Sequence, residues 1–227
     1  MLIKVKGILP PEAVAKCRKL LEQASWADGK HTAGTQAAQV KNNQQLPEDV
    51  PELEELRSIV GYHIQKSGLF FTAALPKRVF PPLFNKYSGE SNSFGNHVDN
   101  AIRTFVKTWE HIRTDVSCTV FLSNPDEYEG GELVIEDTYG TNSVKLDAGD
   151  AILYPATSLH RVNPVTKGAR LASFFWVESM VRENEHRRIL FDMDTAIFNL
   201  RETVGETEPV VLMTSCYHNL LRLWAET

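Results

Sequence analysis

The sequence predicts an α+β protein with a mainly β core, because helical segments flank a long region of short strands. Near both ends, apolar residues recur at the three- and four-residue spacing of an amphipathic helix. Between residues 78 and 178, short runs of β-branched and aromatic residues alternate with turn residues. Many short strands at this spacing are typical of an antiparallel sandwich or barrel. We therefore expect a β core with helices packed on it.

The N-terminal part, residues 1–77, is expected to be mainly helical. Pro10-Pro11 precedes the run EAVAKCRKLLEQA, and proline fits well in the first turn of a helix. A second helix is expected to begin at Pro51. Between the two helices, residues 27–47 are polar and rich in Gly, Gln and Asn, which predicts a long loop.

The central part, residues 78–178, is expected to form the β core. Turn dipeptides such as Pro125-Asp126 separate its apolar runs. The candidate strands are 78–88, 94–100, 115–123, 132–138, 142–147, 151–155, 158–163 and 170–178. The insert at 101–114 contains several basic residues, so a substrate-facing lid and a solvated loop are both open. We expect this insert and the 27–47 loop to flank the mouth of a site and to become ordered when substrate binds.

The C-terminal part, residues 179–227, returns to helical spacing and predicts a small helical unit of two helices. The segment RETVGETEP, residues 201–209, is the expected linker between them. The apolar stripes of this unit either cover the core or form a homo-oligomer face, and the sequence leaves both open.

Charge and composition exclude several classes of protein. The chain has 227 residues, and its 29 acidic and 24 basic side chains give a net charge of −5. An acidic protein is a poor candidate for binding nucleic acid, which requires basic surface. No apolar run reaches the 18 residues of a membrane span, and the N-terminus lacks the apolar region of a signal peptide. Three widely spaced cysteines predict reduced thiols, so we expect a cytoplasmic protein without membrane contact.

Three residues are candidate metal ligands. In a strand, positions i and i+2 point to the same face, so His97 and Asp99 in GNHVDN would converge on one point. His160 follows a short apolar strand and a loop, and it supplies a third ligand in this interpretation. Two histidines and one carboxylate on one side of a metal form the facial triad of non-haem Fe(II) oxygenases.

Arg170 is the candidate for binding a carboxylate. It is expected to lie on the strand neighbouring His160 in one hairpin, in a run that is otherwise apolar. A buried unpaired guanidinium is costly, so this position favours an anionic ligand held by two parallel hydrogen bonds. A metal with open positions beside a carboxylate-binding arginine is typical of a 2-oxoglutarate-dependent oxygenase.

The motifs occur in the order found in a known family. Tyr87 is followed by His97-x-Asp99, Gly130-Gly131-Glu132-Leu133, Gly149-Asp150, His160 and Arg170. This order resembles the prolyl-4-hydroxylase-like Fe(II)/2-oxoglutarate dioxygenases. More closely, the stretches FNKYSGESNSFGNHVDNAIR and LYPATSLHRVNPVTKGAR and the helical tail resemble the bacterial PKHD-type hydroxylases, the PiuC/YbiX kind associated with iron uptake.

The resemblance implies a fold and a set of site residues. The family fold is a double-stranded β-helix, or jelly roll, which agrees with the predicted strands. His97, Asp99 and His160 match the iron ligands of the family. Arg170 matches the residue that pairs with the distal carboxylate of 2-oxoglutarate, and Tyr87 matches a position whose hydroxyl often meets that co-substrate.

The resemblance also implies a reaction. Fe(II) is the cofactor, 2-oxoglutarate and O2 are co-substrates, and L-ascorbate supports the iron. Oxidative decarboxylation of 2-oxoglutarate to succinate and CO2 is coupled to hydroxylation of a substrate. A protein residue and a siderophore-related small molecule are both open as that substrate, and no residue decides between them.

Two other classes remain open on the sequence. A cupin-like jelly roll that senses a metal or 2-oxoglutarate would bind without turnover, and Arg170 argues against a plain cupin. A nucleic-acid dealkylase of the same superfamily is disfavoured by the acidic net charge. Succinate formation from 2-oxoglutarate and added Fe(II) separates an enzyme from a sensor.

Overall fold

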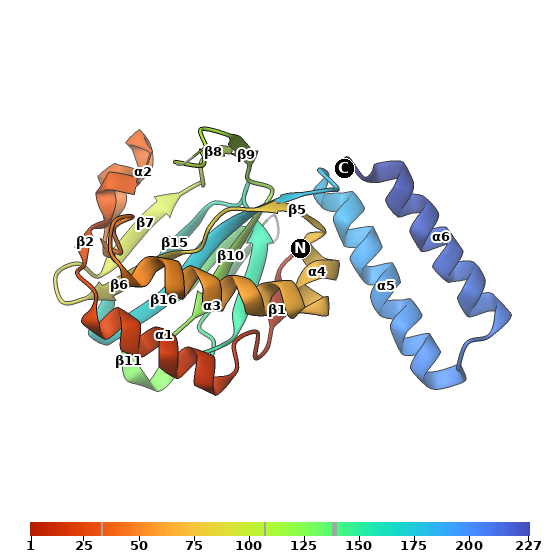
Figure 1. Ribbon diagram of the computed structural model, residues 1–227, viewed down its shortest axis with the longest axis horizontal. Coiled ribbons are helices and arrows are strands. Elements are labelled where there is room, and N and C mark those ends of the chain that lie inside the picture. The colour runs from red at the N-terminus through yellow and green to blue at the C-terminus, as the bar shows by residue number, and fades with distance from the viewer. Residues whose placement is uncertain (33, 107, 138–139) are drawn as a thin grey trace.

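Two facing antiparallel sheets, with helices outside the larger one, form the body of the protein (Figure 1). The computed structural model describes residues 1–32, 34–106, 108–137 and 140–227. Ala33 in the predicted 27–47 loop, Lys107 in the 101–114 insert and the pair 138–139 lie outside the described residues. The predicted α+β jelly-roll class is confirmed by this arrangement and by the structural relatives reported below.

The larger sheet has nine strands over the described residues. Seven of them run in the order β1-β14-β10-β16-β6-β4-β2, and β5 and β11 also pair with β16. The strands are β1 (Ile3–Val5), β2 (Ala27–Asp28), β4 (Gln44–Gln45), β5 (Pro76–Val79), β6 (Leu83–Ser88), β10 (Val116–Phe121), β11 (Tyr128–Gly130), β14 (Ala151–Pro155) and β16 (Val165–Ser179).

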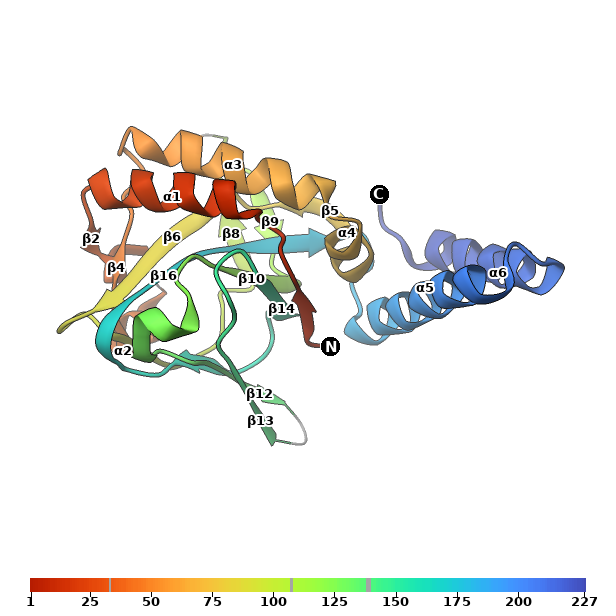
Figure 2. The ribbon, with the colours of Figure 1, turned by 90° about the horizontal axis from the view of Figure 1, so that it is seen from below.

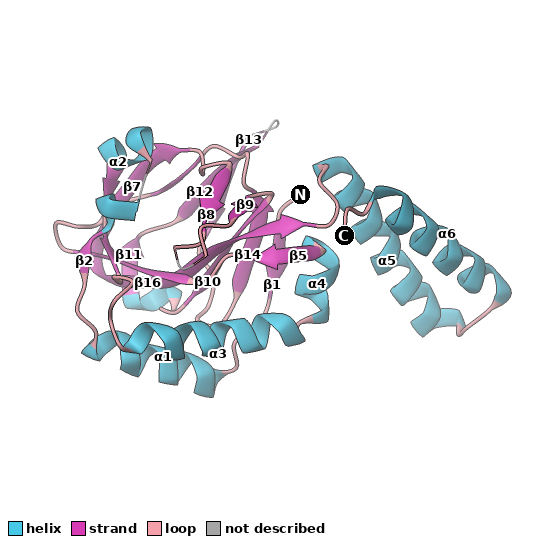
Figure 3. Cartoon of the chain, turned by 45° about the horizontal axis from the view of Figure 1, so that its top comes forward, coloured by secondary structure: helices cyan, strands magenta, loops and turns pink. Residues whose placement is uncertain are grey.

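The smaller sheet lies across the interior from the larger one (Figure 3). Its strand order is β13-β12-β15-β7-β3 over the described residues. The strands are β3 (Lys41–Asn42), β7 (Ser93–His97), β12 (Leu133–Asp137), β13 (Gly140–Val144) and β15 (His160–Val162). A separate hairpin of β8 (Ile102–Thr104) and β9 (His111–Arg113) occupies the predicted insert.

Helices α1 (Pro11–Gln23) and α3 (Glu52–Lys66) lie side by side on the outer face of the larger sheet (Figure 2). They begin at or beside a proline and bury one apolar stripe each, as their spacing predicts. The short elements are α2 (Thr35–Val40), α4 (Gly68–Ala74) and the 3-10 turns at Gly29–Thr32 and Pro125–Glu127. The main apolar core lies between α1, α3 and this face, and it includes Leu56, Cys118 and Phe175.

Strand alternation gives the larger sheet two different faces. Along β16, Phe175 joins the core under the helices, whereas Arg170, Phe174 and Trp176 line a cavity between the sheets. The partners Tyr87 and Leu83 on β6 pair with Arg170 and Phe174 and line the same cavity. One face of the sheet therefore stabilises the fold, and the other forms the wall of a site.

The C-terminal hairpin of α5 (Asn184–Val204) and α6 (Glu208–Trp224) projects away from the sheets (Figures 1 and 2). Its two helices bury a small apolar cluster of their own, including Leu190, Ile197 and Tyr217. Leu75 and Val181 in the same cluster attach the hairpin to the body. The division at residues 77 and 178 into three parts remains a prediction.

Several element boundaries differ from those that the sequence predicts. The predicted strand 78–88 is two strands, β5 and β6, because Pro81-Pro82 interrupts the pairing. The predicted 27–47 loop contains α2 and three two-residue strands. Helix α4 was not predicted, and β16 begins at Val165, earlier than expected.

The predicted hairpin of His160 and Arg170 is wrong. His160 lies on β15 in the smaller sheet, and Arg170 lies on β16 in the larger sheet. The chain crosses from one sheet to the other at Val162–Val165, since Val165 already belongs to β16. The two residues therefore line one cavity from different sheets and do not lie on neighbouring strands of one hairpin. No helix among the described residues combines the length and the apolar character needed to cross a membrane.

The packing of α3 predicts a large effect of a single core substitution. Leu56 is fully buried, whereas Leu212 on α6 is 65% exposed. We expect Leu56→Ala to lower the free energy of unfolding by about 2–5 kcal/mol, because it leaves a cavity under α3. Leu212→Ala, the same chemical change, should alter it by less than about 0.5 kcal/mol. Urea denaturation followed by circular dichroism measures both, and similar losses in the two variants would contradict this account.

Candidate metal centre

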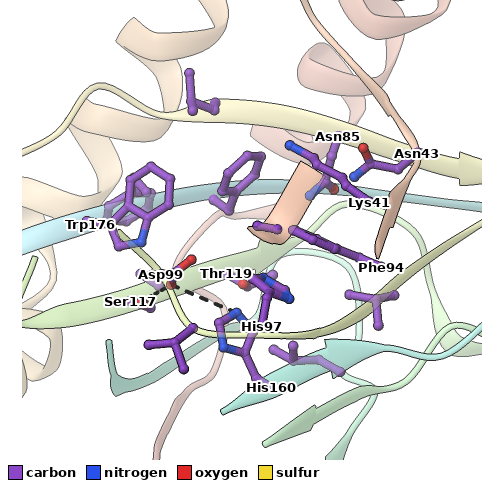
Figure 4. A pocket seen from close by; sticks show the side chains of 18 of the residues that line it. Lys41, Asn43, Asn85, Phe94, His97, Asp99, Ser117, Thr119, His160 and Trp176 are labelled. Carbon is purple, nitrogen blue, oxygen red and sulfur yellow. Dashed lines mark hydrogen bonds and ion pairs between the residues drawn. The ribbon is translucent and has the colours of Figure 1, made fainter. Parts of the chain in front are cut away.

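His97, Asp99 and His160 converge at one end of the interior (Figure 4). One ligand atom from each lies within 4.8 Å of the others. The pairing of β7 with β15 places His160 directly opposite His97, and their ring centroids are 4.2 Å apart. The structure therefore brings together the three residues that the sequence singled out as metal ligands.

Backbone carbonyls orient both imidazole rings. Nδ1 of His97 is 2.8 Å from the carbonyl oxygen of Gly95, and Nδ1 of His160 is 3.0 Å from that of Ser158. A carbonyl oxygen accepts only, so each Nδ1 carries the proton and donates it. Each Nε2 then holds the lone pair that a metal requires.

Asp99 reaches the site from just beyond the end of β7. The strand ends at His97, so the expectation that both ligands lie within one strand is only partly correct. The Ser117 hydroxyl on β10 donates to Asp99 Oδ2 at 2.6 Å, and His160 Nε2 is 3.9 Å from the same oxygen. Ser117, which the sequence did not suggest, thus fixes the carboxylate from the opposite sheet.

The electrostatics of His97 favour a neutral ring. Burial, reinforced by the neighbouring His160, lowers the pKa of His97 to about 4. A histidine whose charged form is disfavoured keeps its ring neutral near pH 7, which is the form that ligates metals. The donor set of two imidazoles and one carboxylate fits a divalent transition metal.

The three residues open onto a cavity of about 780 Å³, including its mouth, between the two sheets. Aromatic side chains form much of its wall, among them Phe94, Phe174 and Trp176. The flanking segments also contribute, since Gly34 and Lys41 from 27–47 and Arg103 from 101–114 line it. Both segments thus flank the site as expected, whereas their ordering on binding remains a prediction.

Arg170 lies in the same cavity and is 1% exposed. Its guanidinium carbon is 5.3 Å from the centroid of the Tyr87 ring and 5.1 Å from that of Phe121. Its Nε has no hydrogen-bond partner, and no described carboxylate forms an ion pair with it. A buried guanidinium in this state is strongly unfavourable unless an anion binds there, so the position fits a carboxylate ligand.

Tyr87 on β6 pairs with Arg170 across the sheet and is 1% exposed. Burial raises the pKa of its phenol, and the positive charge of Arg170 partly offsets that effect. The phenol is therefore protonated near pH 7 and offers a hydroxyl beside the guanidinium. The structure thus places Tyr87 beside Arg170 in the cavity.

Sequence reasoning also missed the polar lining residues Lys41 and Asn85. Lys41 and Asn85 are 4% and 7% exposed, and both line the cavity. Asn85 lies two residues from both Leu83 and Tyr87 along β6. Its side chain therefore points to the same face as theirs, a signal that is available once the strand is recognised. Lys41 lies in the polar 27–47 segment, where no periodicity distinguishes a buried residue from an exposed one.

Comparisons with known proteins agree with this fold and site. Residues 82–178 match the model of the 2OG-Fe(II) oxygenase superfamily, and residues 184–226 match the PKHD-type hydroxylase C-terminal domain. A PKHD-type hydroxylase of Saccharophagus degradans is 58% identical, and one of Polaromonas sp. is 57% identical. Both alignments cover 100% of each chain.

Solved structures share the fold at low sequence identity. A prolyl hydroxylase of Trichoplax adhaerens, in complex with a hypoxia-inducible-factor peptide fragment, matches with a TM-score of 0.56 and 14% identity, over 83% of this chain and 86% of that one. A prolyl-4-hydroxylase of Pseudomonas putida matches with a TM-score of 0.51 and 18% identity, over 78% and 92%. At these identities the likeness establishes the jelly-roll fold alone.

The fold, the His-Asp-His site and the matched superfamily together define a 2-oxoglutarate-dependent dioxygenase that uses Fe(II). Within that class, the full-length relatives make the assignment more specific. The chain belongs to the family of PKHD-type hydroxylases.

Proposed function

We propose that His97, Asp99 and His160 hold the Fe(II) and that Arg170, with Tyr87 beside it, binds 2-oxoglutarate. The observation that carries this proposal is the juxtaposition in one cavity of three converging ligand atoms and a buried guanidinium without an acidic partner. His97, Asp99 and His160 would coordinate the metal, and Arg170 would supply a positive charge to the distal carboxylate of 2-oxoglutarate.

Each residue has a defined task in this proposal. When bound, Fe(II) supplies the redox chemistry that couples decarboxylation of 2-oxoglutarate to hydroxylation. Three protein ligands on one side leave the remaining coordination positions open, as a chelating co-substrate and O2 require. Arg170 fixes the far end of the co-substrate, and the aromatic walls exclude water from the site.

The same proposal covers the products of the reaction, the location of the protein, its reductant and its physiological role. The product of the reaction is a hydroxylated substrate, together with succinate and CO2. We place the protein in the cytoplasm, with L-ascorbate maintaining the iron in its reduced state, and with a role in iron uptake. The Trichoplax relative was solved with a peptide fragment, whereas HygX from Streptomyces hygroscopicus was solved with hygromycin B, so both substrate types occur on this fold.

The alternative of a cupin-like protein that senses a metal or 2-oxoglutarate makes a different prediction. Such a protein would bind Fe(II) and 2-oxoglutarate but form no succinate. The measurement is succinate formation by the purified protein with Fe(II), 2-oxoglutarate and ascorbate. Tight binding without turnover would favour the sensor.

Removing the carboxylate ligand should abolish metal binding and turnover together. We expect Asp99→Ala to lose both stoichiometric iron and succinate formation, because two imidazoles alone hold Fe(II) weakly. Iron content by mass spectrometry and succinate by chromatography check this. The control is Asp49→Ala, which removes an exposed carboxylate in a turn and should match the wild type. Normal turnover in Asp99→Ala would show that the metal lies elsewhere.

Removing the guanidinium of Arg170 should weaken the binding of 2-oxoglutarate and leave the metal in place. Losing one side of a buried charge pair costs about 2–5 kcal/mol, so Arg170→Ala should raise the KM for 2-oxoglutarate tens-fold or more. Arg170→Lys should be intermediate, since an ammonium offers a point charge and not a planar pair of donors.

The readouts are a 2-oxoglutarate titration of succinate formation and the iron content of each variant. Arg188→Ala, which removes an exposed arginine on α5, is the control. If Arg170→Ala kept the wild-type dependence on 2-oxoglutarate, another cation would have to bind the co-substrate.

A further inference from the structure

Tyr128 is a buried phenol that lies outside the cavity lining but close to Arg170. It is on β11 and is 3% exposed. It belongs to the apolar cluster that also contains Tyr87 and Phe121, and these are the two rings over which the Arg170 guanidinium lies. Because Tyr128 is not among the residues that line the cavity, it can act on a bound co-substrate only through a neighbour.

The pairing of β11 with β16 brings Tyr128 toward Arg170. Tyr128 is directly opposite Gly168, and Arg170 lies two residues further along the same strand. Positions two apart share one face of a strand, and such diagonal partners have Cα atoms about 7–8 Å apart, within reach of aromatic and long side chains. The strand register therefore directs the phenol and the guanidinium to the same face of the sheet.

Two glycines and a lysine hold the Tyr128 ring in place. A Cβ at Gly131 would lie 2.9 Å from Tyr128 Cε2, and a Cβ at Gly168 would lie 3.0 Å from Tyr128 Cα. Both glycines have a positive φ, +68° and +76°, which other residues rarely adopt. Lys145 Nζ donates to the Tyr128 carbonyl oxygen at 2.7 Å and lies 4.0 Å from the ring centroid. The fold thus gives this phenol a defined position.

The hydroxyl of Tyr128 interacts with the side chain of Arg170. Burial raises the pKa of the phenol, whereas the positive charge of Arg170 and hydrogen bonding with its guanidinium lower it. The hydrogen bond is a loose one, because no described group meets the hydroxyl in full hydrogen-bond geometry, and the same holds for Arg170 Nε. The phenol is protonated near pH 7, so its oxygen is a neutral acceptor beside a buried cation.

The guanidinium of Arg170 has more donors than a carboxylate can use. A guanidinium carries five N–H groups, and a carboxylate bound by two parallel hydrogen bonds takes two of them from one edge. The rings of Tyr87 and Phe121 contact the group without fixing the direction of its N–H bonds, since cation–π attraction acts on the charge as a whole. A hydrogen bond to one of the remaining donors would fix that direction.

We infer that Tyr128 is a positioning residue for 2-oxoglutarate that acts through Arg170. Its hydroxyl oxygen accepts a hydrogen bond from a guanidinium donor that the carboxylate does not use, and so orients the opposite edge toward the co-substrate. A guanidinium oriented in advance binds a carboxylate more tightly, because less side-chain freedom is lost on binding. This inference deepens the proposed function and rests on the assignment of Arg170 made there.

The test removes the hydroxyl and keeps the ring. Each protein is loaded with Zn(II), which does not support turnover, and its affinity for N-oxalylglycine, an unreactive analogue of 2-oxoglutarate, is measured by calorimetry. We expect Tyr128→Phe to weaken this affinity, and to raise the KM for 2-oxoglutarate in succinate formation, by about three- to tenfold. The kcat at saturating 2-oxoglutarate and the iron content should stay at the wild-type values. Tyr62→Phe, the same change at an exposed tyrosine on α3, should match the wild type throughout.

A double-mutant cycle separates positioning from a purely structural role. In the Arg170→Ala background, Tyr128→Phe should have no further effect on the affinity for N-oxalylglycine, because the group through which it acts is absent. An equal loss in both backgrounds would overturn the inference, as would wild-type affinity in Tyr128→Phe itself. A lowered urea midpoint of Tyr128→Phe without weaker binding would likewise assign the hydroxyl to the fold alone. If Arg170→Ala bound N-oxalylglycine as tightly as the wild type, the proposed function would fail instead.

Discussion

The pairing of β7 with β15 is the constraint on which the site depends. In this register His160 is opposite His97, and both rings point into the space between the sheets. Because side chains alternate along a strand, a slip of one residue would turn one histidine to the outer surface and leave two ligands. The apolar neighbours Phe94 and Val162 also pair with each other and belong to the interior, across a register shift that separates them from the histidine pair. The pairing of two short strands therefore sets the donor geometry of the two histidines.

The second requirement is that the two sheets face each other at close range. The metal ligands come from the smaller sheet and its edge, while Arg170, Tyr87 and Ser117 come from the larger one. Helices α1 and α3 cover the outer face of the larger sheet and make that face rigid. Side chains on its inner face are thus supported by an apolar core that takes no part in the chemistry. A site built between two packed layers gains precision from both.

Much of the site could be predicted from the sequence, and less of the topology. His97 and Asp99 share the i, i+2 spacing of a strand and Arg170 stands in an apolar run, so local pattern and the family resemblance were sufficient to single out these candidates. The pairing partners of the strands could not be found in this way, because the same sequence pattern suits both a hairpin and a crossover between two sheets. This is why His160 and Arg170 were placed on adjacent strands. Lys41 escaped notice for a related reason: its burial results from long-range pairing of β3 with β7, which no local signal records.

The residues of the cavity differ in how firmly the fold holds them. The His97–His160 pair and Arg170 lie on strands with partners on both sides, whereas Lys41 and Arg103 lie on strands of two and three residues at the periphery. Substitution at such peripheral strands disturbs few backbone hydrogen bonds. The side chains on these two short strands can therefore change without disturbing the strand pairing that positions the two histidines and Arg170.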